Sequence, residues 1–264
     1  MYILAIETTG AEGSVALLQT VHDEAVNVEK GDESEKKQYR ERITERKIKG
    51  QMSHLRELIP SIEAVLLLSG TSKEEITHIA VSVGPGSFTG IRIGVSTARA
   101  LSQAMGLETA VSVPTLQGFL YKEEAERAKA DGKVCCAVIN ARRGQVYGMI
   151  DDYLADGPYM MAEVLELIKD KLFADGKQVI FFGDGVDAYE DMIHEALDGF
   201  GEYELADKEY RYQEAYAVAR YAAANAQVQS VGLAELLPDY MRKAEAEQKL
   251  EAGQLPICRG PKQE

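Results

Sequence analysis

The chain has 264 residues, a formal net charge of -14 and an apolar content of 45%. This length and composition are typical of a globular protein with a sizeable core, folded as one large domain or two smaller ones. The acidic balance argues against autonomous binding to nucleic acid, which depends on basic residues that displace counterions from phosphates. If the function involves nucleic acid, a partner must supply most of the positive field.

The sequence predicts neither a membrane span nor a signal peptide. No uncharged apolar run approaches the roughly 20 residues needed to cross a bilayer. The first residues, MYILAIETTG, lack a basic segment and carry Glu7 within the apolar run, which indicates a buried strand. The three cysteines suit neither a disulfide framework nor a metal quartet. We therefore expect a cytoplasmic protein without membrane contacts.

The first half of the chain predicts alternating strands and helices. Residues 2–6 and 14–18 are β-rich runs around a glycine-containing turn, the pattern of a β-hairpin. Residues 22–50 carry eight acidic and eight basic residues, which suit either solvated strands around a turn at 30–32 or a partly mobile insertion. Further elements are a helix over 52–68 with a kink or local adjustment at Pro60, a strand over 78–83, a helix from about Ile91 to Met105, a strand over 108–113 and a helix over 115–129.

The second half repeats this order of elements. It predicts a hairpin from 133–140 and 145–151, a helix over 161–172, a strand over 177–183 and helices over about 186–197 and 213–228. Because each half opens with a hairpin, we expect a duplicated architecture, although no repeat is visible residue by residue. The predicted units are an N-terminal α/β lobe at 1–112, with the charged insertion at 22–50, a C-terminal α/β lobe at 113–240 and a tail at 241–264.

The stretch SVGPGSFTGIRIG, which begins at Ser82, has the layout of a phosphate-binding loop between a strand and a helix. A P-loop requires G-x-x-x-x-G-K-S/T, and a Rossmann loop requires G-x-G-x-x-G. Here both spacings are one residue too long, and Ile91 and Arg92 stand where the P-loop has lysine and a hydroxyl residue. Thr89 as a helix cap beside an anion therefore remains an alternative to a tight structural turn.

The helix after this loop is rich in small residues, which let another helix approach closely. Its positions Val95, Ala98, Leu101 and Met105 follow helical spacing. Two interpretations stay open, a docking face for a partner helix and an ordinary core face.

Other chemistry-bearing patterns are weak. None of the four histidines forms an H-x-x-x-H pair, since His54 is followed four residues later by Leu58, so we predict no metal site. The polar residues Glu7, Thr8 and Thr9 follow the first strand, where they suit either a remnant of a phosphate-binding loop or a polar turn.

The motifs ILAIETTGAEGSVALL, VSVGPGSFTGIRIG, NARRGQVYGMID and PDYMRKAEAE make the chain similar to the TsaB family of bacterial tRNA threonylcarbamoyladenosine biosynthesis. The resemblance covers nearly the whole chain except 22–50. It implies an actin-like, sugar-kinase-like (ASKHA) fold of two α/β lobes with mixed sheets. It also implies a non-catalytic scaffold that pairs with a TsaD-like catalytic subunit and is engaged by a TsaE-like ATPase.

The same resemblance implies that the chain has no cofactor of its own and that ATP and a divalent metal belong to the partner subunits. It also implies that the chain contacts tRNA only indirectly, through the complex, and that it can form a homodimer when it is alone. Asn140 departs from the aspartate that the family often has there. The implied partner interface consists of Gly84, Pro85, Gly86, Ser87, Phe88, Thr89, Gly90, Arg92, Val95, Ala98, Leu101 and Met105.

Two alternative functions are weighed against this one. The first is a nucleotide-binding, kinase-like enzyme of the same superfamily that uses Glu7 and the glycine loop. The second is a glycoprotein endopeptidase, a historical label of the family. It is disfavoured because the sequence shows no metal pair, nucleophile and base for it.

Overall fold

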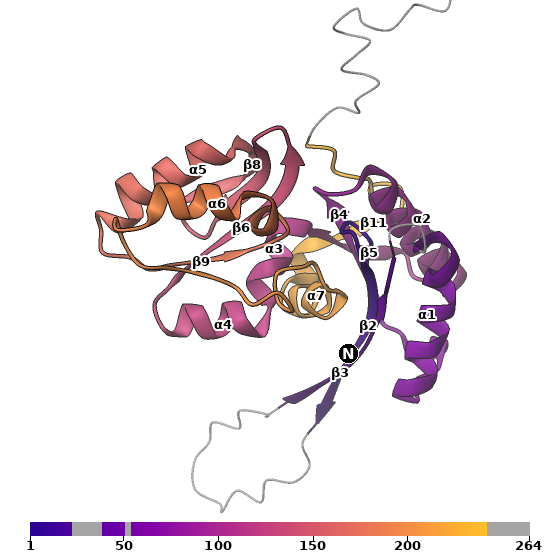
Figure 1. Cartoon of the computed structure of the whole chain (residues 1–264). Helices are drawn as coiled ribbons and strands as arrows, with labels where there is room; N and C mark the ends of the chain where they lie inside the picture. The colour runs from indigo at the N-terminus through magenta and orange to yellow at the C-terminus, as the bar shows by residue number, and fades with distance from the viewer. Residues whose placement is uncertain (23–38, 51–53, 242–264) are drawn as a thin grey trace, which may run out of the picture.

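A computed structural model describes residues 1–22, 39–50 and 54–241 and contains two mixed β-sheets (Figure 1). The first sheet has the strand order β11-β5-β4-β1-β2-β3. Its strands are β1 (Tyr2–Glu7), β2 (Gly13–His22), β3 (Tyr39–Ile48), β4 (His78–Gly84), β5 (Thr109–Pro114) and β11 (Ser230–Gly232). The predicted hairpin of the first two strands is confirmed, because β1 and β2 pair antiparallel.

The second sheet has the strand order β10-β9-β6-β7-β8. Its strands are β6 (Val134–Arg142), β7 (Gln145–Ile150), β8 (Leu154–Met160), β9 (Val179–Phe182) and β10 (Tyr203–Leu205). β6 and β7 form the predicted second hairpin, and β8, which the sequence did not indicate, extends it. In both sheets the first strand is antiparallel to the second and parallel to the fourth. This shared order confirms the expected duplication.

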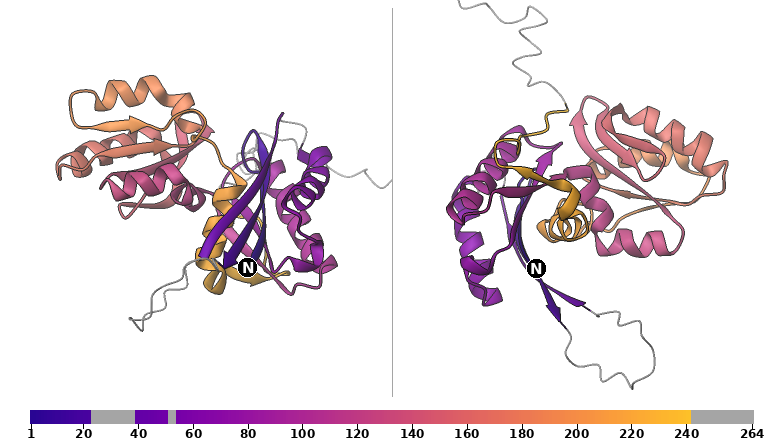
Figure 2. Two further views of the ribbon diagram at one scale, coloured as in Figure 1. Left: turned by 90° about the horizontal axis from the view of Figure 1, so that it is seen from below. Right: turned by 180° about the vertical axis from the view of Figure 1, so that it is seen from behind.

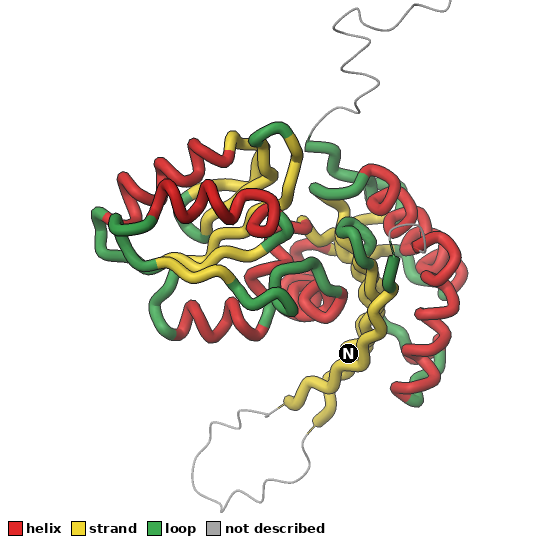
Figure 3. Tube along the Cα trace, viewed as in Figure 1, coloured by secondary structure: helices red, strands yellow, loops and turns green. Residues whose placement is uncertain are grey.

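Helices cover both faces of each sheet (Figure 3). On the first sheet, α1 and α2 cover the face turned away from the second sheet, and α7 covers the face turned toward it (Figure 2). On the second sheet, α5 and α6 cover one face and α3 and α4 cover the other. The helices are α1 (His54–Ser69), α2 (Phe88–Ala104), α3 (Thr115–Gly118), α4 (Glu123–Ala130), α5 (Met161–Leu167), α6 (Gly185–Leu197) and α7 (Ala215–Gln229).

The central strand β1 explains why the first sheet is a three-layer structure. Its alternate residues Leu4 and Ile6 face α1 and α2, whereas Ile3 and Ala5 face α7. A strand that is buried on both faces needs a continuous apolar run, which is the pattern that YILAI provides.

The chain returns to the first sheet near its end. α7 packs on β1, β2 and β5, and β11 pairs antiparallel with β5. Both elements lie within the lobe predicted at 113–240, so this boundary assigns them to the wrong sheet. The reason is physical: an apolar helix face indicates burial but does not indicate which of two similar sheets buries it.

Several element boundaries also differ from prediction. The helix expected over 115–129 is interrupted between α3 and α4, where Lys122 is buried and pairs with Glu214. The helix expected over 161–172 changes from α5 to a π-helical segment at Ile168–Phe173. α1 continues through Pro60.

Ten residues of the charged insertion predicted at 22–50 form the integral strand β3. β3 pairs with β2 along ten residues, from Ile48 opposite Gly13 to Tyr39 opposite His22. The extended-strand alternative is therefore correct for 39–48. The turn predicted at 30–32 and the tail beyond Met241 lie outside the described residues.

The face of α2 that contains Val95 and Ala98 points into the core of the first lobe. Val95 is 3% exposed and Ala98 is fully buried, and both contact the cluster formed with β1, β4 and α1. The prediction that these two residues contact a partner is wrong, because the chain's own sheet covers them. The alternative interpretation, an ordinary core face, is the correct one for this side of the helix.

We predict that Val95→Arg destabilises the fold and Ser96→Arg does not. Arginine at position 95 would bury an unpaired charge and lower the free energy of unfolding by about 3–5 kcal/mol. Ser96 is the exposed neighbour, and its variant should stay within about 0.5 kcal/mol of the parent. Urea unfolding followed by circular dichroism measures both. Equal stability of the two variants would contradict the assigned core face.

Candidate functional site

The glycine loop connects β4 to α2 and starts the helix earlier than predicted. α2 begins at Phe88, and its N-cap is Ser87, whose Oγ accepts a hydrogen bond from the Gly90 N–H at 3.3 Å. Thr89 was predicted as a cap, but it lies inside the first turn with its side chain exposed. This cap assignment is therefore corrected to Ser87.

The glycines of this loop allow its backbone to lie directly on the turn after β1. Gly84 and Gly86 have φ angles of 128° and 153°, a region that L side chains rarely adopt. A Cβ atom at Gly90 would overlap the carbonyl oxygen of Thr8, and one at Gly86 would lie 2.6 Å from that of Thr9. Close packing therefore requires glycine at both positions.

Hydrogen bonds lock the loop to this turn. The Ser87 N–H donates to the Thr9 carbonyl at 2.7 Å, and the Thr8 hydroxyl donates to the Gly90 carbonyl at 2.7 Å. Each bond joins residues about 80 positions apart in the chain. The loop and the turn thus form one rigid unit.

Glu7 lies beneath this unit and is 1% exposed. Its carboxylate accepts hydrogen bonds from the Thr9 N–H at 2.5 Å, from the Thr9 hydroxyl at 2.6 Å and from the Ser82 hydroxyl. Burial raises the pKa of Glu7, and the hydrogen bonds from Ser82 and Thr9 oppose that shift. Of the three residues proposed as a phosphate-loop remnant, only Thr9 lines a cleft between the lobes.

An aromatic and cationic stack covers the outer side of the loop. The Arg92 guanidinium lies 4.0 Å from the Phe88 ring centroid, and its Nε donates to the Tyr240 hydroxyl at 2.8 Å. Phe88 and Tyr240 stack with their centroids 4.5 Å apart. The predicted interface residues Phe88 and Arg92 thus hold the segment near Tyr240 against the loop, while Arg92 remains exposed.

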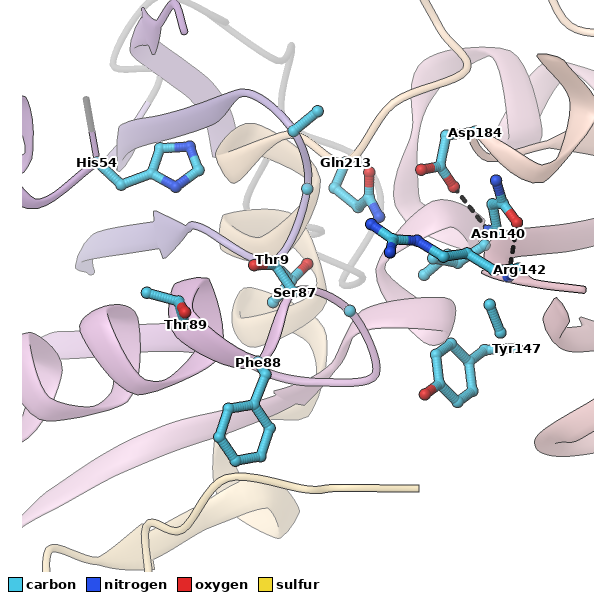
Figure 4. A pocket seen from close by; sticks show the side chains of 15 residues that line it. Thr9, His54, Ser87, Phe88, Thr89, Asn140, Arg142, Tyr147, Asp184 and Gln213 are labelled. Atoms are coloured by element: carbon cyan, nitrogen blue, oxygen red, sulfur yellow. Dashed lines mark hydrogen bonds between the residues drawn. The ribbon is translucent and has the colours of Figure 1, made fainter. Parts of the chain in front are cut away.

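A cleft of about 540 Å³ separates the two lobes at this loop (Figure 4). The first lobe contributes the turn after β1, His54 and the residues from Gly86 to Thr89. The second lobe contributes the β6–β7 hairpin and Asp184, and Gln213 lies on the segment that leads back to the first lobe.

Two buried polar side chains of the cleft each have one nitrogen without a hydrogen-bond partner in the described part of the chain. His54 is 6% exposed and Gln213 is 8% exposed, and the Nε2 atom of each makes no hydrogen bond there. Burial lowers the pKa of His54, so its ring is neutral at neutral pH. A neutral imidazole and an amide can serve a polar ligand as hydrogen-bonding groups.

The wall from the second lobe is preorganised. Asn140 Oδ1 accepts a hydrogen bond from the Arg142 N–H at 2.8 Å, and Asp184 Oδ1 accepts one from the Asn140 N–H at 2.9 Å. Burial raises the pKa of Asp184. Arg142 extends from this wall toward Gln213 (Figure 4). Asn140 therefore orders the hairpin turn.

A metal centre is not assembled in the described part of the chain, where no three His, Cys, Asp or Glu side chains are grouped to hold an ion. His54 and Leu58 lie one turn apart on α1, and Leu58 is 1% exposed in the core. The described helices also include none that is long and apolar enough to span a membrane.

The predicted interface residues divide into buried and accessible sets. Ser87, Thr89 and Arg92 are exposed, and Gly86, Phe88, Leu101 and Met105 are half-buried. Besides Val95 and Ala98, the buried residues are Gly84, Pro85 and Gly90. The latter three shape the loop from within.

The outer face of α1 and α2 combines small residues of α2, which the sequence indicated, with apolar residues of α1 whose exposure it did not predict. On α2 the small residues Ser96, Ala100 and Ala104 form an exposed row at i, i+4 spacing. The neighbouring helix α1 exposes Leu55, Ile59, Leu67 and Leu68, of which Leu67 is 82% exposed. Leu55 matches the spacing of the core positions of α1 but is exposed, whereas Ile59, Leu67 and Leu68 lie outside that pattern, which was the available signal.

The two lobes of one topology, each with a mixed sheet, and the cleft between them define the actin-like, sugar-kinase-like (ASKHA) class of fold. A crystal structure of a Pseudomonas aeruginosa protein described as similar to the peptidase YeaZ has this fold. It superposes with a TM-score of 0.65 at 20% identity and covers 91% of this chain and 99% of its own.

Sequence comparisons narrow this class. The family model described as "TsaD: tRNA N6-adenosine threonylcarbamoyltransferase" matches residues 48–250. The tRNA threonylcarbamoyladenosine biosynthesis protein TsaB of Bacillus subtilis is 28% identical over 205 residues, 75% of this chain and 83% of the relative. The Escherichia coli protein of the same name is 39% identical over 99 residues, 36% of this chain and 39% of the relative. The chain therefore belongs to this family, and among its members to the TsaB proteins.

We predict that Glu7→Gln changes how stability depends on pH. Because the folded-state pKa of Glu7 lies above its ordinary value of 4.5, the native state holds its proton more tightly than the unfolded state does. The stability that this proton contributes is complete below pH 4.5 and is lost as pH rises through the folded-state pKa. We therefore compare the unfolding free energy of the parent minus that of the variant. This difference should fall as pH rises above 4.5, by at most about 1.4 kcal/mol per pH unit.

Chemical denaturation of both proteins across this pH range measures the difference. Glu63→Gln, which removes an exposed carboxylate from α1, is the control for the change in net charge. A stability difference between parent and variant that rises with pH would contradict the prediction. It would show that the three hydrogen-bond donors hold Glu7 as a carboxylate.

Proposed function

We propose that the chain is the non-catalytic scaffold and activator subunit of a complex that forms threonylcarbamoyladenosine in tRNA. It pairs with a TsaD-like catalytic subunit, and a TsaE-like ATPase engages the pair. The names of its relatives support a role in this tRNA modification. The observation that carries the more specific role is the outer face of α1 and α2, because it offers a helix-sized contact surface away from the cleft.

This face suits a helical partner for two reasons. The exposed row of Ser96, Ala100 and Ala104 lets a second helix approach α2 closely. The exposed leucines of α1, such as Leu67 and Leu68, supply apolar area that water covers in the isolated chain. The same face can pair two copies of the chain when the catalytic partner is absent.

The proposal that the chain lacks its own chemistry rests on the residues around the cleft. His54 has the buried core residue Leu58 where a second helix-borne histidine would stand, and the carboxylate of Glu7 is occupied by internal donors. The nucleotide and the divalent metal are therefore assigned to the partner subunits. The chain would work in the cytoplasm, where tRNA is modified.

A nucleotide-binding enzyme is the second candidate, and the cleft is the observation that favours it. The cleft has room for a ligand and contains the unpartnered Nε2 atoms of His54 and Gln213. That hypothesis uses Glu7 and the glycine loop, and the loop residues from Gly86 to Thr89 line the cleft. However, Glu7 does not line it, and its carboxylate is occupied by internal donors. The scaffold role is therefore preferred.

We predict that the purified chain alone transfers no threonylcarbamoyl group and that transfer appears when the catalytic subunit of the same organism and the ATPase are added. The assay follows modified adenosine in an unmodified tRNA transcript by mass spectrometry. Transfer by the isolated chain would refute the non-catalytic role. Binding of ATP and Mg²⁺ by the chain alone at sub-millimolar concentration, measured by calorimetry, would favour the second candidate.

We predict that Ala100→Arg weakens pairing with the catalytic subunit while the fold persists. Ala100 is exposed, so arginine there is tolerated in the free chain but prevents close approach of a partner helix. Ala162→Arg on α5 is the matched control, since Ala162 is also an exposed helical alanine. We expect at least about a tenfold loss of affinity for Ala100→Arg, equivalent to 1.4 kcal/mol, and none for the control. Unchanged affinity in light scattering or calorimetry would place the interface elsewhere.

A further inference from the structure

Strand β3 carries its two glutamates on one face and its three arginines on the other. Residues at odd positions face α7, where Glu41 pairs with Arg220 at 3.4 Å and Glu45 accepts a hydrogen bond from the Tyr216 N–H at 3.2 Å. Lys47, on the same face, pairs with Glu214. The charged side chains on this face therefore have partners within the chain.

The even positions carry three arginines on the opposite face. Arg40, Arg42 and Arg46 are all exposed, and Ile48 of the same face joins the core beneath α1. Within the described residues, the side chains of Arg42 and Arg46 form no ion pair or hydrogen bond. At roughly 3.3 Å per residue, the three arginines extend along about 20 Å of the strand.

The strand β2 adds no opposing charge to this face. Arg46 lies opposite Val15 and Arg42 lies opposite Gln19, and Leu17 lies between them opposite Thr44. Glu57 and Glu63 of the α1 helix form no ion pair with Arg42 or Arg46 in the described part of the chain. Although the chain has a net charge of -14, this face of β3 exposes arginines and no acidic residue of β2 or β3 among the described residues. We call Arg40, Arg42 and Arg46 the arginine face.

We propose that the arginine face binds the phosphate backbone of the tRNA substrate. This inference rests on the proposed function and revises the expectation that the chain meets tRNA only through its partners. Guanidinium groups suit phosphates because their planar donors form paired hydrogen bonds with two oxygens. The acidic remainder of the surface repels RNA, so contact at this face also orients the tRNA on the complex.

The composition of the face favours RNA over an acidic protein. Protein interfaces rely on buried aromatic or aliphatic anchors. The described residues of β2 and β3 expose no large apolar side chain. A regular row of exposed arginines without such anchors matches a polyanion, whose charges repeat along its length.

The test compares Arg42→Glu/Arg46→Glu with Lys171→Glu/Lys177→Glu. Both double variants change the net charge equally, and the two control lysines are exposed on the second lobe. Each variant is assembled with the catalytic subunit, and assembly is checked by light scattering. An unmodified tRNA transcript is then titrated by fluorescence anisotropy between about 50 and 200 mM salt.

The arginine-face variant should assemble normally and bind tRNA roughly tenfold more weakly at the lower salt concentration. The slope of log K against log salt concentration should shrink by roughly 1.4 to 1.8, which corresponds to the loss of two phosphate contacts. The lysine control should keep the affinity and the slope of the parent. An unchanged slope for the arginine-face variant overturns the inference and leaves the proposed function intact.

Two other outcomes are also decisive. Loss of assembly in the arginine-face variant alone would mean that this face contacts protein, which overturns the inference. Failure of the parent chain to assemble with the catalytic subunit would contradict the proposed function itself, and the inference that rests on it.

Discussion

The close contact between the turn after β1 and the loop after β4 is the constraint on which the first lobe depends. The Thr8 carbonyl leaves no room for a side chain at Gly90, and the Thr8 hydroxyl holds the Gly90 carbonyl. This contact fixes the position of α2 on the sheet, and α2 in turn sets which of its faces reaches solvent. The glycines that resemble a phosphate cradle thus serve the approach of two backbone segments.

Much of the fold could be predicted from the sequence, because the spacing of apolar residues and the order of strands and helices can be read from short segments of the chain. Continuous apolar runs indicated β1, β4 and β9, and the repeated succession of hairpin, strand and helix indicated two related lobes. Local patterns could not show that α7 and β11 return to the first sheet. That pairing is decided by long-range packing between segments about 120 residues apart, such as Val111 and Ser230.

The candidate site was predicted less completely than the fold, and α2 shows why. Small residues occur on both sides of this helix, so sequence spacing alone could not distinguish the buried Ala98 from the exposed Ala100. His54 was seen as a lone histidine, but only the tertiary structure shows that it lines the same cleft as Gln213. A cleft between two lobes is a property of their arrangement and leaves little trace in either lobe's sequence.

The net charge of the chain likewise does not show where its charged side chains lie. A total of -14 describes the field far from the protein, but salt screens exposed charges beyond about 8 Å at physiological ionic strength. A phosphate that touches β3 is therefore governed by the few side chains around it. The two-residue period of a strand separates the acidic residues of β3, which face α7, from Arg42 and Arg46, which face outward. An acidic protein can in this way carry a basic contact surface that its composition conceals.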